Sequence, residues 1–196
     1  MAAPSAAPSS STIPASTLSV SVVVGNPKPQ SRTLSVAVSL VEHLFAGHDV
    51  SVTTVDLAAH ADVVFRWPRP ELDAISAQVA SSDIAVFASP TYKATYTGLL
   101  KAFLDRYPSN GLAGLVAIPL HTGADFTHAM GPSVNLAPLL TELGAIVPGR
   151  GFYFVTSQMD RMDAVVAEAA TAYRSNIHRV AYLARFTAAP TQEDLT

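Results

Sequence analysis

LSVSVVVGNPKPQSRTLSVAVSLVEHLF, residues 18–45, changes its hydrophobic period from that of a strand to that of a helix across one loop. Residues 18–24 are a short run rich in valine, which predicts a buried strand that ends at Gly25. Over residues 33–45 the apolar side chains recur every three or four positions, which predicts an amphipathic helix that Gly47 ends. This strand–loop–helix unit is the building block of an α/β fold.

The same alternation continues along the rest of the chain. Further strands are predicted at 50–55, 83–88, 115–120 and within 145–156, and further helices at 71–80, 97–106, 128–143 and 160–185. Five strands that alternate with five helices favour a parallel sheet with helices on both faces. Ligands of such sheets bind beyond the carboxyl ends of the strands, where the strand order reverses. The loops after the first, third and fourth strands are therefore the candidate site.

The length and composition fit one folded domain. The chain has 196 residues, of which 49% are hydrophobic and 14% charged, and this allows a sizeable core. We predict a disordered tail rich in Ala, Pro and Ser at residues 1–16, a folded domain at 17–186 and a flexible tail at 187–196. The first 17 residues contain no Lys, no Arg and no continuous apolar segment, so we expect no secretory signal and a soluble, cytoplasmic protein.

Charge and cysteine content exclude several function classes. The net charge is -3 and the basic residues are scattered, so neither a nucleic acid nor a membrane surface is an expected partner. The chain has no cysteine, which excludes disulfides, thiolate nucleophiles, iron–sulfur clusters and Cys-based zinc sites, and which suits a reducing cytosol.

The loop after the first strand, GNPKPQSRT at residues 25–33, runs directly into a helix N-terminus. Free backbone N–H groups and the helix dipole favour an anion there. Ser31 and Thr33 add hydroxyl groups, and the Arg32 guanidinium can hold a phosphate through two N–H groups. The alternative is that Ser31 or Thr33 only caps the helix. The loop matches neither the G-x-G-x-x-G nor the Walker pattern.

The loop after the third strand, SPTYKATYTG at residues 89–98, contains two tyrosines and a proline. Tyr92 and Tyr96 are candidate walls for a flat aromatic ligand. The backbone groups of Thr91, Tyr92 and Lys93 can address the polar edge of that ligand. The alternative is that both tyrosines are ordinary half-buried aromatics.

The loop after the fourth strand, HTGADFTH at residues 121–128, offers the backbone N–H groups of Thr122 and Gly123. His121, Asp125 and His128 raise the question of a metal. A metal site needs a third convergent ligand and usually shows tighter spacing, so we expect none and leave the role of the two histidines open.

Residues 18–185 resemble the NAD(P)H-dependent FMN reductases, especially those that supply reduced flavin to two-component sulfonate monooxygenases. The run SPTYKATYTGLLKAFLD at 89–105 is similar to the P-x-Y-x-x-x-Y-[ST]-G-x-[LF]-K-x-x-x-D element of that family. Residues 25–33 match the pattern G-x-P-x-x-x-S-R-[ST]. Thr122-Gly123 followed by His128 matches T-G-G-x-x-x-H, except that Ala124 replaces the second glycine. Alanine tolerates fewer backbone conformations at that position.

This resemblance implies a flavodoxin-like three-layer α/β/α sandwich, a five-stranded parallel sheet of order 2-1-3-4-5, and a homodimer or homotetramer. It implies that the FMN phosphate lies on Ser31, Arg32 and Thr33 with Asn26 nearby. The flavin ring would lie against Pro90, Thr91, Tyr92 and Lys93, with Thr122 and Gly123 on its other side. The resemblance also implies that Tyr96 lies in a distorted turn at the subunit interface and influences whether flavin stays bound or exchanges.

The expected activity is hydride transfer from NADPH or NADH to FMN, which requires no dedicated catalytic acid or base. Reduced FMN then either leaves for a partner monooxygenase or stays bound and reduces a quinone or azo compound. Two further hypotheses are a flavodoxin-type electron carrier and a structural domain that has lost flavin. The sequence does not decide between NADPH and NADH; Arg66, Arg69, Arg106 and Arg150 are candidate ligands of a second phosphate.

Overall fold

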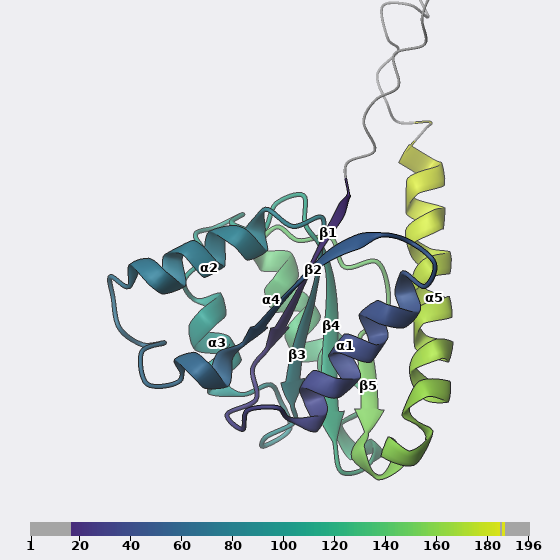
Figure 1. Cartoon of the computed structure of the whole chain (residues 1–196), viewed down its shortest axis with the longest axis horizontal. Coiled ribbons are helices and arrows are strands. Elements are labelled where there is room, and N and C mark those ends of the chain that lie inside the picture. The colour runs from purple at the N-terminus through teal and green to yellow at the C-terminus, as the bar shows by residue number, and fades with distance from the viewer. Residues whose placement is uncertain (1–16, 185, 187–196) are drawn as a thin grey trace, which may run out of the picture.

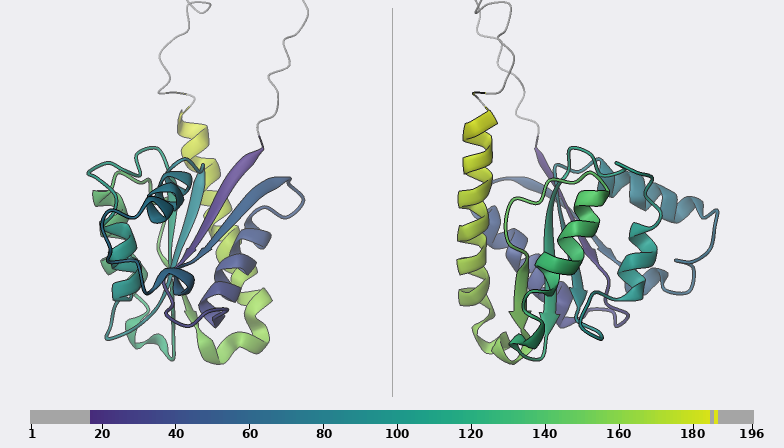
Figure 2. Two further views of the ribbon diagram at one scale, coloured as in Figure 1. Left: turned by 60° about the vertical axis from the view of Figure 1, so that its left-hand side comes forward. Right: turned by 180° about the vertical axis from the view of Figure 1, so that it is seen from behind.

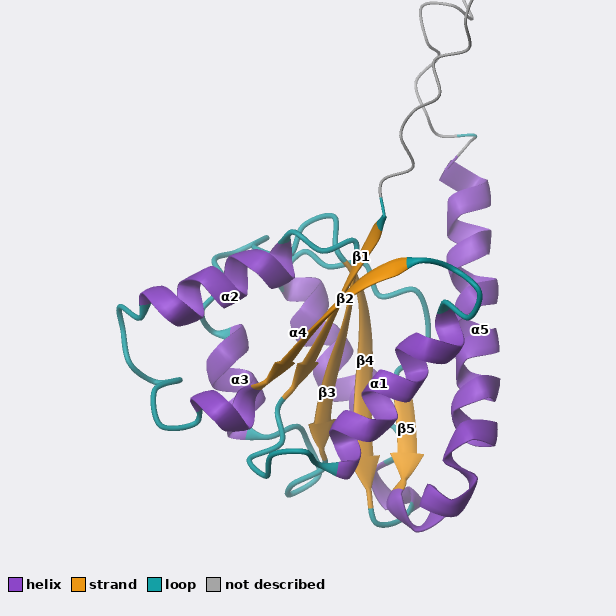
Figure 3. Ribbon diagram, viewed as in Figure 1, coloured by secondary structure: helices purple, strands orange, loops and turns teal. Residues whose placement is uncertain are grey.

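Five parallel strands form the centre of the computed structural model, which describes residues 17–184 and 186. Their spatial order is β2 (Val50–Asp56), β1 (Leu18–Val24), β3 (Ile84–Pro90), β4 (Val116–Gly123) and β5 (Phe152–Val155). Every neighbouring pair is parallel, so all the arrows point the same way in Figure 3. The predicted order 2-1-3-4-5 is confirmed. The predicted tails at 1–16 and 187–196 lie outside the described residues.

Helices cover both faces of this sheet, which confirms the three-layer prediction. α1 (Arg32–Leu44) and α5 (Met162–Ala184) lie on one face, and α2 (Pro70–Ala80), α3 (Gly98–Leu104) and α4 (Ala137–Glu142) lie on the other (Figures 1 and 2). Alternate strand side chains point to opposite faces. Val22 and Val24 therefore pack toward α1 and α5, whereas Val23 packs toward α2 and α3.

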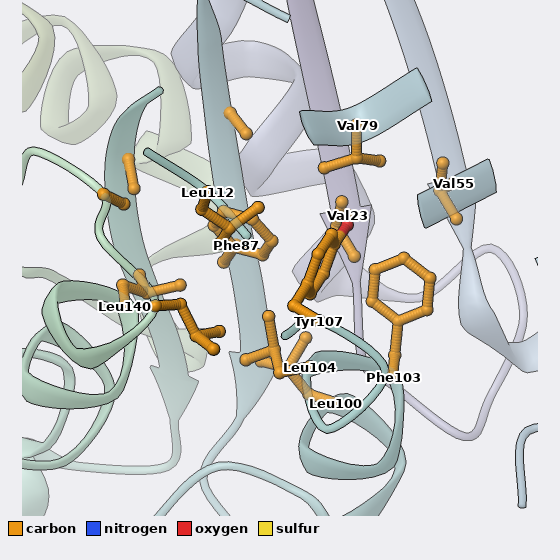
Figure 4. Packing of buried hydrophobic residues seen from close by; sticks show 14 of the residues in the cluster. Val23, Val55, Val79, Phe87, Leu100, Phe103, Leu104, Tyr107, Leu112 and Leu140 are labelled. Atoms are coloured by element: carbon orange, nitrogen blue, oxygen red, sulfur yellow. The ribbon is translucent and has the colours of Figure 1, made fainter. Parts of the chain in front are cut away.

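The core beneath α2, α3 and α4 is built from large apolar side chains (Figure 4). Phe87 of β3 and Phe103 of α3 are fully buried. Burial of a side chain of this size stabilises the fold by roughly 1.5–3 kcal/mol. The packing of Leu100 and Phe103 against the sheet fixes α3, and with it the end of the loop that precedes this helix.

Strands β3 and β4 run two and three residues beyond their predicted ends, to Pro90 and Gly123. Proline lacks the N–H that a central strand needs. The N atom of Pro90 faces β1, but the pairing of β1 with β3 stops at Ala88. The N atom of Pro119 faces β5, which pairs with β4 only from Leu120 onward. Neither missing N–H therefore leaves an unpaired acceptor in the ladder.

The helix predicted over 128–143 is divided in the structure. A 3-10 turn at Phe126–His128 is followed by a π-helical segment at Pro132–Leu136 and then by α4. Pro138 has no N–H to donate to Val134, so the ordinary register is interrupted and the N–H of Ala137 donates to the Pro132 carbonyl instead. Further 3-10 turns, at Leu57–His60 and Thr156–Arg161, follow β2 and β5.

The loops that follow the strands gather at one end of the sheet. The first described residues of β1 and the end of α5 lie at the opposite end (Figure 1). Among the described helices none is long and apolar enough to span a bilayer.

Candidate functional site

The N-terminus of α1 is capped by Ser31. Ser31 is the N-cap residue, and its Oγ accepts a hydrogen bond from the N–H of Leu34 at 3.2 Å. The first intrahelical bond runs from the N–H of Ser35 to the Ser31 carbonyl at 3.1 Å, so the N–H groups of Arg32 and Thr33 precede the helical ladder. Both roles of Ser31 are therefore compatible: its oxygen caps the helix while its O–H proton can still be donated to an anion.

A buried polar cluster ties this first loop to β4. Thr33 Oγ1 accepts from Asn26 Nδ2 at 3.2 Å and lies 2.7 Å from Thr122 Oγ1. The Oδ1 atom of Asn26 accepts from the N–H of Lys28 at 2.9 Å. Asn26, Thr33 and Thr122 are all buried, so each of these polar groups has the partner that burial demands. Their hydroxyl and amide groups hold the two segments in register.

The third loop is fixed to both neighbours. The N–H of Thr91 donates to the Thr122 carbonyl at 2.7 Å, which extends the pairing of β3 with β4. The Thr97 Oγ1 donates to the Gly25 carbonyl at 2.5 Å, and the Thr97 N–H donates to Ser89 Oγ at 2.9 Å. Three loops that are far apart in sequence therefore form one connected framework.

A cavity of about 380 Å³ lies between these loops. Nine of the eleven residues predicted to bind the flavin line it, namely Asn26, Ser31, Arg32, Thr33, Pro90, Thr91, Tyr92, Thr122 and Gly123. Four residues outside that prediction also line it, namely Lys28, Gln30, Ala124 and Thr156. Thr156 follows β5, so the topology could have indicated it: the fifth strand ends at the same edge of the sheet as the other four.

Lys93 and Tyr96 do not line this cavity. Lys93 is exposed at the tip of the third loop. The ring of Tyr96 packs edge-on against His121, with 6.3 Å between the ring centroids. Tyr96 lies between the Tyr92–Thr95 turn and α3, whereas the π-helical segment of the described chain lies at Pro132–Leu136. The expected place of Tyr96 at a subunit interface stays a prediction.

In the described chain no three His, Cys, Asp or Glu side chains converge, around His121 and His128 or elsewhere. His121 is fully buried, and burial lowers its pKa to about 4. Neither of its ring nitrogens has a partner among the described residues. Asp125 instead caps the short turn that follows it, since its Oδ1 accepts from the N–H of Thr127 at 2.8 Å. The hydrogen bonds from Thr127 lower the pKa of Asp125.

Two of the four arginines considered for a second phosphate already have carboxylate partners. Arg106 is buried, lies 2.5 Å from an Asp73 oxygen and stacks 4.1 Å above the Trp67 ring. Arg69 lies 3.3 Å from Glu71. Arg150 is exposed. Its guanidinium has one hydrogen-bond partner among the described residues, the sulfur of Met130 at 3.6 Å. The preference between NADPH and NADH is therefore not decided by an evident phosphate clamp.

The residues around the cavity fit a phosphorylated aromatic ligand such as FMN. The Oγ1 atom of Thr91 is buried at the cavity wall without a hydrogen-bond partner among the described residues, as expected of a group that awaits a polar ligand. The cavity lies at the reversal of strand order between β1 and β3, with a helix N-terminus at one side. This fold and this site define a flavodoxin-like nucleotide-binding protein.

The sequence model of the family described as NADPH-dependent FMN reductase matches residues 18–160. The chain therefore belongs to this family: it is an NAD(P)H-dependent oxidoreductase that acts on FMN.

Individual relatives agree with this assignment. The FMN reductase (NADPH) of Escherichia coli K12 is 35% identical over 129 residues, which cover 64% of this chain and 67% of the relative. The NADH-dependent FMN reductase SfnF of Pseudomonas putida is 27% identical, with coverage of 74% and 82%. The solved structure of an NADH:FMN oxidoreductase in its apo form superposes with a TM-score of 0.70 and 30% identity, over 81% of this chain and 89% of that one.

Proposed function

We propose that the cavity between the three loops is the FMN site. The N-terminus of α1 carries this assignment, because Ser31, Arg32 and Thr33 all line the cavity and begin the helix. A phosphate at this place gains both the helix dipole and charge-assisted hydrogen bonds. Asn26 supports it indirectly, since its side chain holds Thr33 in place.

In this proposal the flavin ring lies against the third and fourth loops. Pro90, Thr91 and Tyr92 line the cavity from the third loop, and Thr122 and Gly123 line it from the fourth. Tyr92 is 52% exposed, so its ring is available to cover a ligand. The Thr91 hydroxyl supplies an unused polar group on the same wall. Lys93 and Tyr96 act on the ring only through the loop that they share with Tyr92.

A flavin held at this site would supply the acceptor for a hydride from the nicotinamide of NADPH or NADH. The contribution of the chain is to hold the phosphate at α1 and to orient the ring against the third and fourth loops. No side chain at the cavity has to take or give a proton in the hydride step, so we assign no catalytic acid or base.

We further propose that residues 17–186 act as one unit in a cytoplasmic homodimer or homotetramer, and that reduced FMN leaves for a partner monooxygenase. Three large apolar side chains between β4 and α4, those of Phe126, Met130 and Val134, are more than half exposed and support self-association. The absence of cysteine suits a reducing compartment.

Arg32→Ala is expected to weaken FMN binding by about 2 kcal/mol, or roughly 30-fold, because it removes a charged donor from the phosphate. The measurement is a titration that follows the quenching of FMN fluorescence. Arg179→Ala is the matched control, since Arg179 is exposed on α5 and stacks on Tyr182 instead of facing the cavity. Equal affinities of Arg32→Ala and the parent would remove the phosphate assignment.

Oxidation of NADH and NADPH, measured with and without free FMN on protein of known visible spectrum, tests what becomes of the flavin. Colourless protein that oxidises nicotinamide only when FMN is added supports release of reduced flavin. Yellow protein that needs a quinone or azo acceptor overturns that proposal in favour of a tightly bound flavin.

A further inference from the structure

The third loop contains a tight turn of unusual backbone conformation at Tyr92–Thr95. Tyr92 and Thr95 exchange two backbone hydrogen bonds, from Tyr92 N to Thr95 O at 2.9 Å and from Thr95 N to Tyr92 O at 3.3 Å. The two residues between them, Lys93 and Ala94, have φ angles of 51° and 73°. Such a turn favours Asn-Gly, because a side chain with a Cβ is strained at positive φ. This chain has neither Asn nor Gly at the two positions.

Strained backbone persists where surrounding contacts fix it. The carbonyl of Ala94 accepts a hydrogen bond from Asn135 Nδ2 at 3.2 Å. Within the described chain this is the one side-chain hydrogen bond to the tip of the turn. Asn135 belongs to the π-helical segment Pro132–Leu136, which lies 41 residues further along the sequence.

The position of this turn matters because its first residue lines the proposed flavin cavity. Tyr92 and its neighbour Thr91 form part of the cavity wall. Thr91 is fixed to β4 through its N–H, whereas within the described residues Tyr92 makes no hydrogen bonds beyond those of the turn that it begins. A change in the turn would therefore move the Tyr92 ring relative to Thr122 and Gly123, which also line the cavity.

We infer that Asn135 is a positioning residue for flavin binding: its side-chain amide holds the Tyr92–Thr95 turn in the strained form that sets the cavity wall. This inference rests on the proposed FMN site. Asn135 itself does not line the cavity and acts on the ligand only through Ala94 and Tyr92.

Asn135→Asp tests the donated hydrogen bond with the least change of shape, because a carboxylate cannot donate to the Ala94 carbonyl. Asn135→Ala tests the same loss without a new charge. We expect both variants to raise the Kd for FMN about five-fold, the scale of one neutral hydrogen bond. Thermal unfolding of Asn135→Ala should stay close to that of the parent, since alanine favours the helical state. Gln78→Ala is the matched control, because Gln78 of α2 donates a similar exposed bond to Thr53, away from the cavity.

A second substitution separates positioning from a merely structural role. Glycine adopts positive φ without strain, so Ala94→Gly makes the turn independent of its hydrogen bond to Asn135. We expect Ala94→Gly combined with Asn135→Ala to restore the Kd for FMN to within about two-fold of that of the parent, on the scale of a Gly/Ala backbone effect. A double variant as weak as Asn135→Ala alone would overturn the inference.

The Arg32→Ala titration keeps the two proposals apart. Normal FMN binding by both Asn135 variants, with weakened binding by Arg32→Ala, overturns the role of Asn135 and leaves the FMN site standing. A parent chain that fails to bind FMN, or one that is indifferent to Arg32→Ala, overturns the site and the role of Asn135 together.

Discussion

Gly25→Ala is expected to destabilise the fold by about 3 kcal/mol, at the upper end of the cost of overpacking a core. A Cβ at residue 25 would overlap the Cβ of Leu100 and lie 3.0 Å from its Cα. Leu100 belongs to α3 and is fully buried, so the backbone of one element would have to move away from the other. The φ angle of Gly25 is not positive, and the demand for glycine is therefore one of space.

The same substitution should also weaken FMN binding. Gly25 joins β1 to the phosphate loop, and its carbonyl accepts the hydrogen bond from Thr97 that ties this loop to the third loop. Displacement of α3 would break this tie and open the cavity between the loops. We expect a loss of at least ten-fold in affinity, measured by FMN fluorescence, together with the loss of stability measured by urea unfolding.

Gly98→Ala is the matched control for Gly25→Ala. Gly98 is the first residue of α3, and a Cβ there would meet nothing within 4 Å. We expect its free energy of unfolding to stay within about 0.5 kcal/mol of that of the parent, as for most surface substitutions. The open space around Gly98 means that helix packing does not require a glycine at this position. If Gly25→Ala were as stable as Gly98→Ala, the close approach of β1 and α3 would not be a constraint.

The fold could be predicted because hydrophobic period and loop position both carry information about it. The change from strand period to helix period across residues 18–45 is strong enough to place β1 and α1 within one or two residues. Carboxyl ends of parallel strands meet at one edge, so the three candidate loops had to lie close together. This is why nine of the eleven expected residues share one cavity.

The missed features depend on contacts between distant segments. His121 and Thr122 are polar, so the apolar pattern of the fourth strand ends at Leu120, yet both are buried members of β4. Thr122 is accommodated by Thr33, which comes from 89 residues earlier. The π-helical segment arises because Pro138 lies inside a helix that has begun several residues earlier. The apolar pattern does not reveal this effect of Pro138.

In the parent, the titration of His121 is expected to lower the free energy of unfolding by about 3 kcal/mol as the pH falls, and His121→Leu should abolish this loss. The pKa of His121 is about 4 in the folded protein against an ordinary value of 6.5. Each unit of difference corresponds to about 1.4 kcal/mol. Between pH 6.5 and 4 the unfolded chain binds a proton that the folded chain does not, so the parent loses stability as the pH falls through this range. Above pH 6.5 His121 is neutral in both the folded and the unfolded chain, so it causes no loss of stability there.

Urea unfolding at intervals from pH 7.5 to 4 measures this effect, and the difference between parent and variant isolates His121 from the carboxylates that also titrate. At neutral pH the variant should be at least as stable as the parent, because leucine removes two buried nitrogens that have no partner in the described structure. His128→Gln is the control, because it replaces an exposed histidine of the same loop. If His121→Leu lost stability with falling pH as steeply as His128→Gln, the buried ring would have to take up its proton without cost, which would require a partner for it in the folded state.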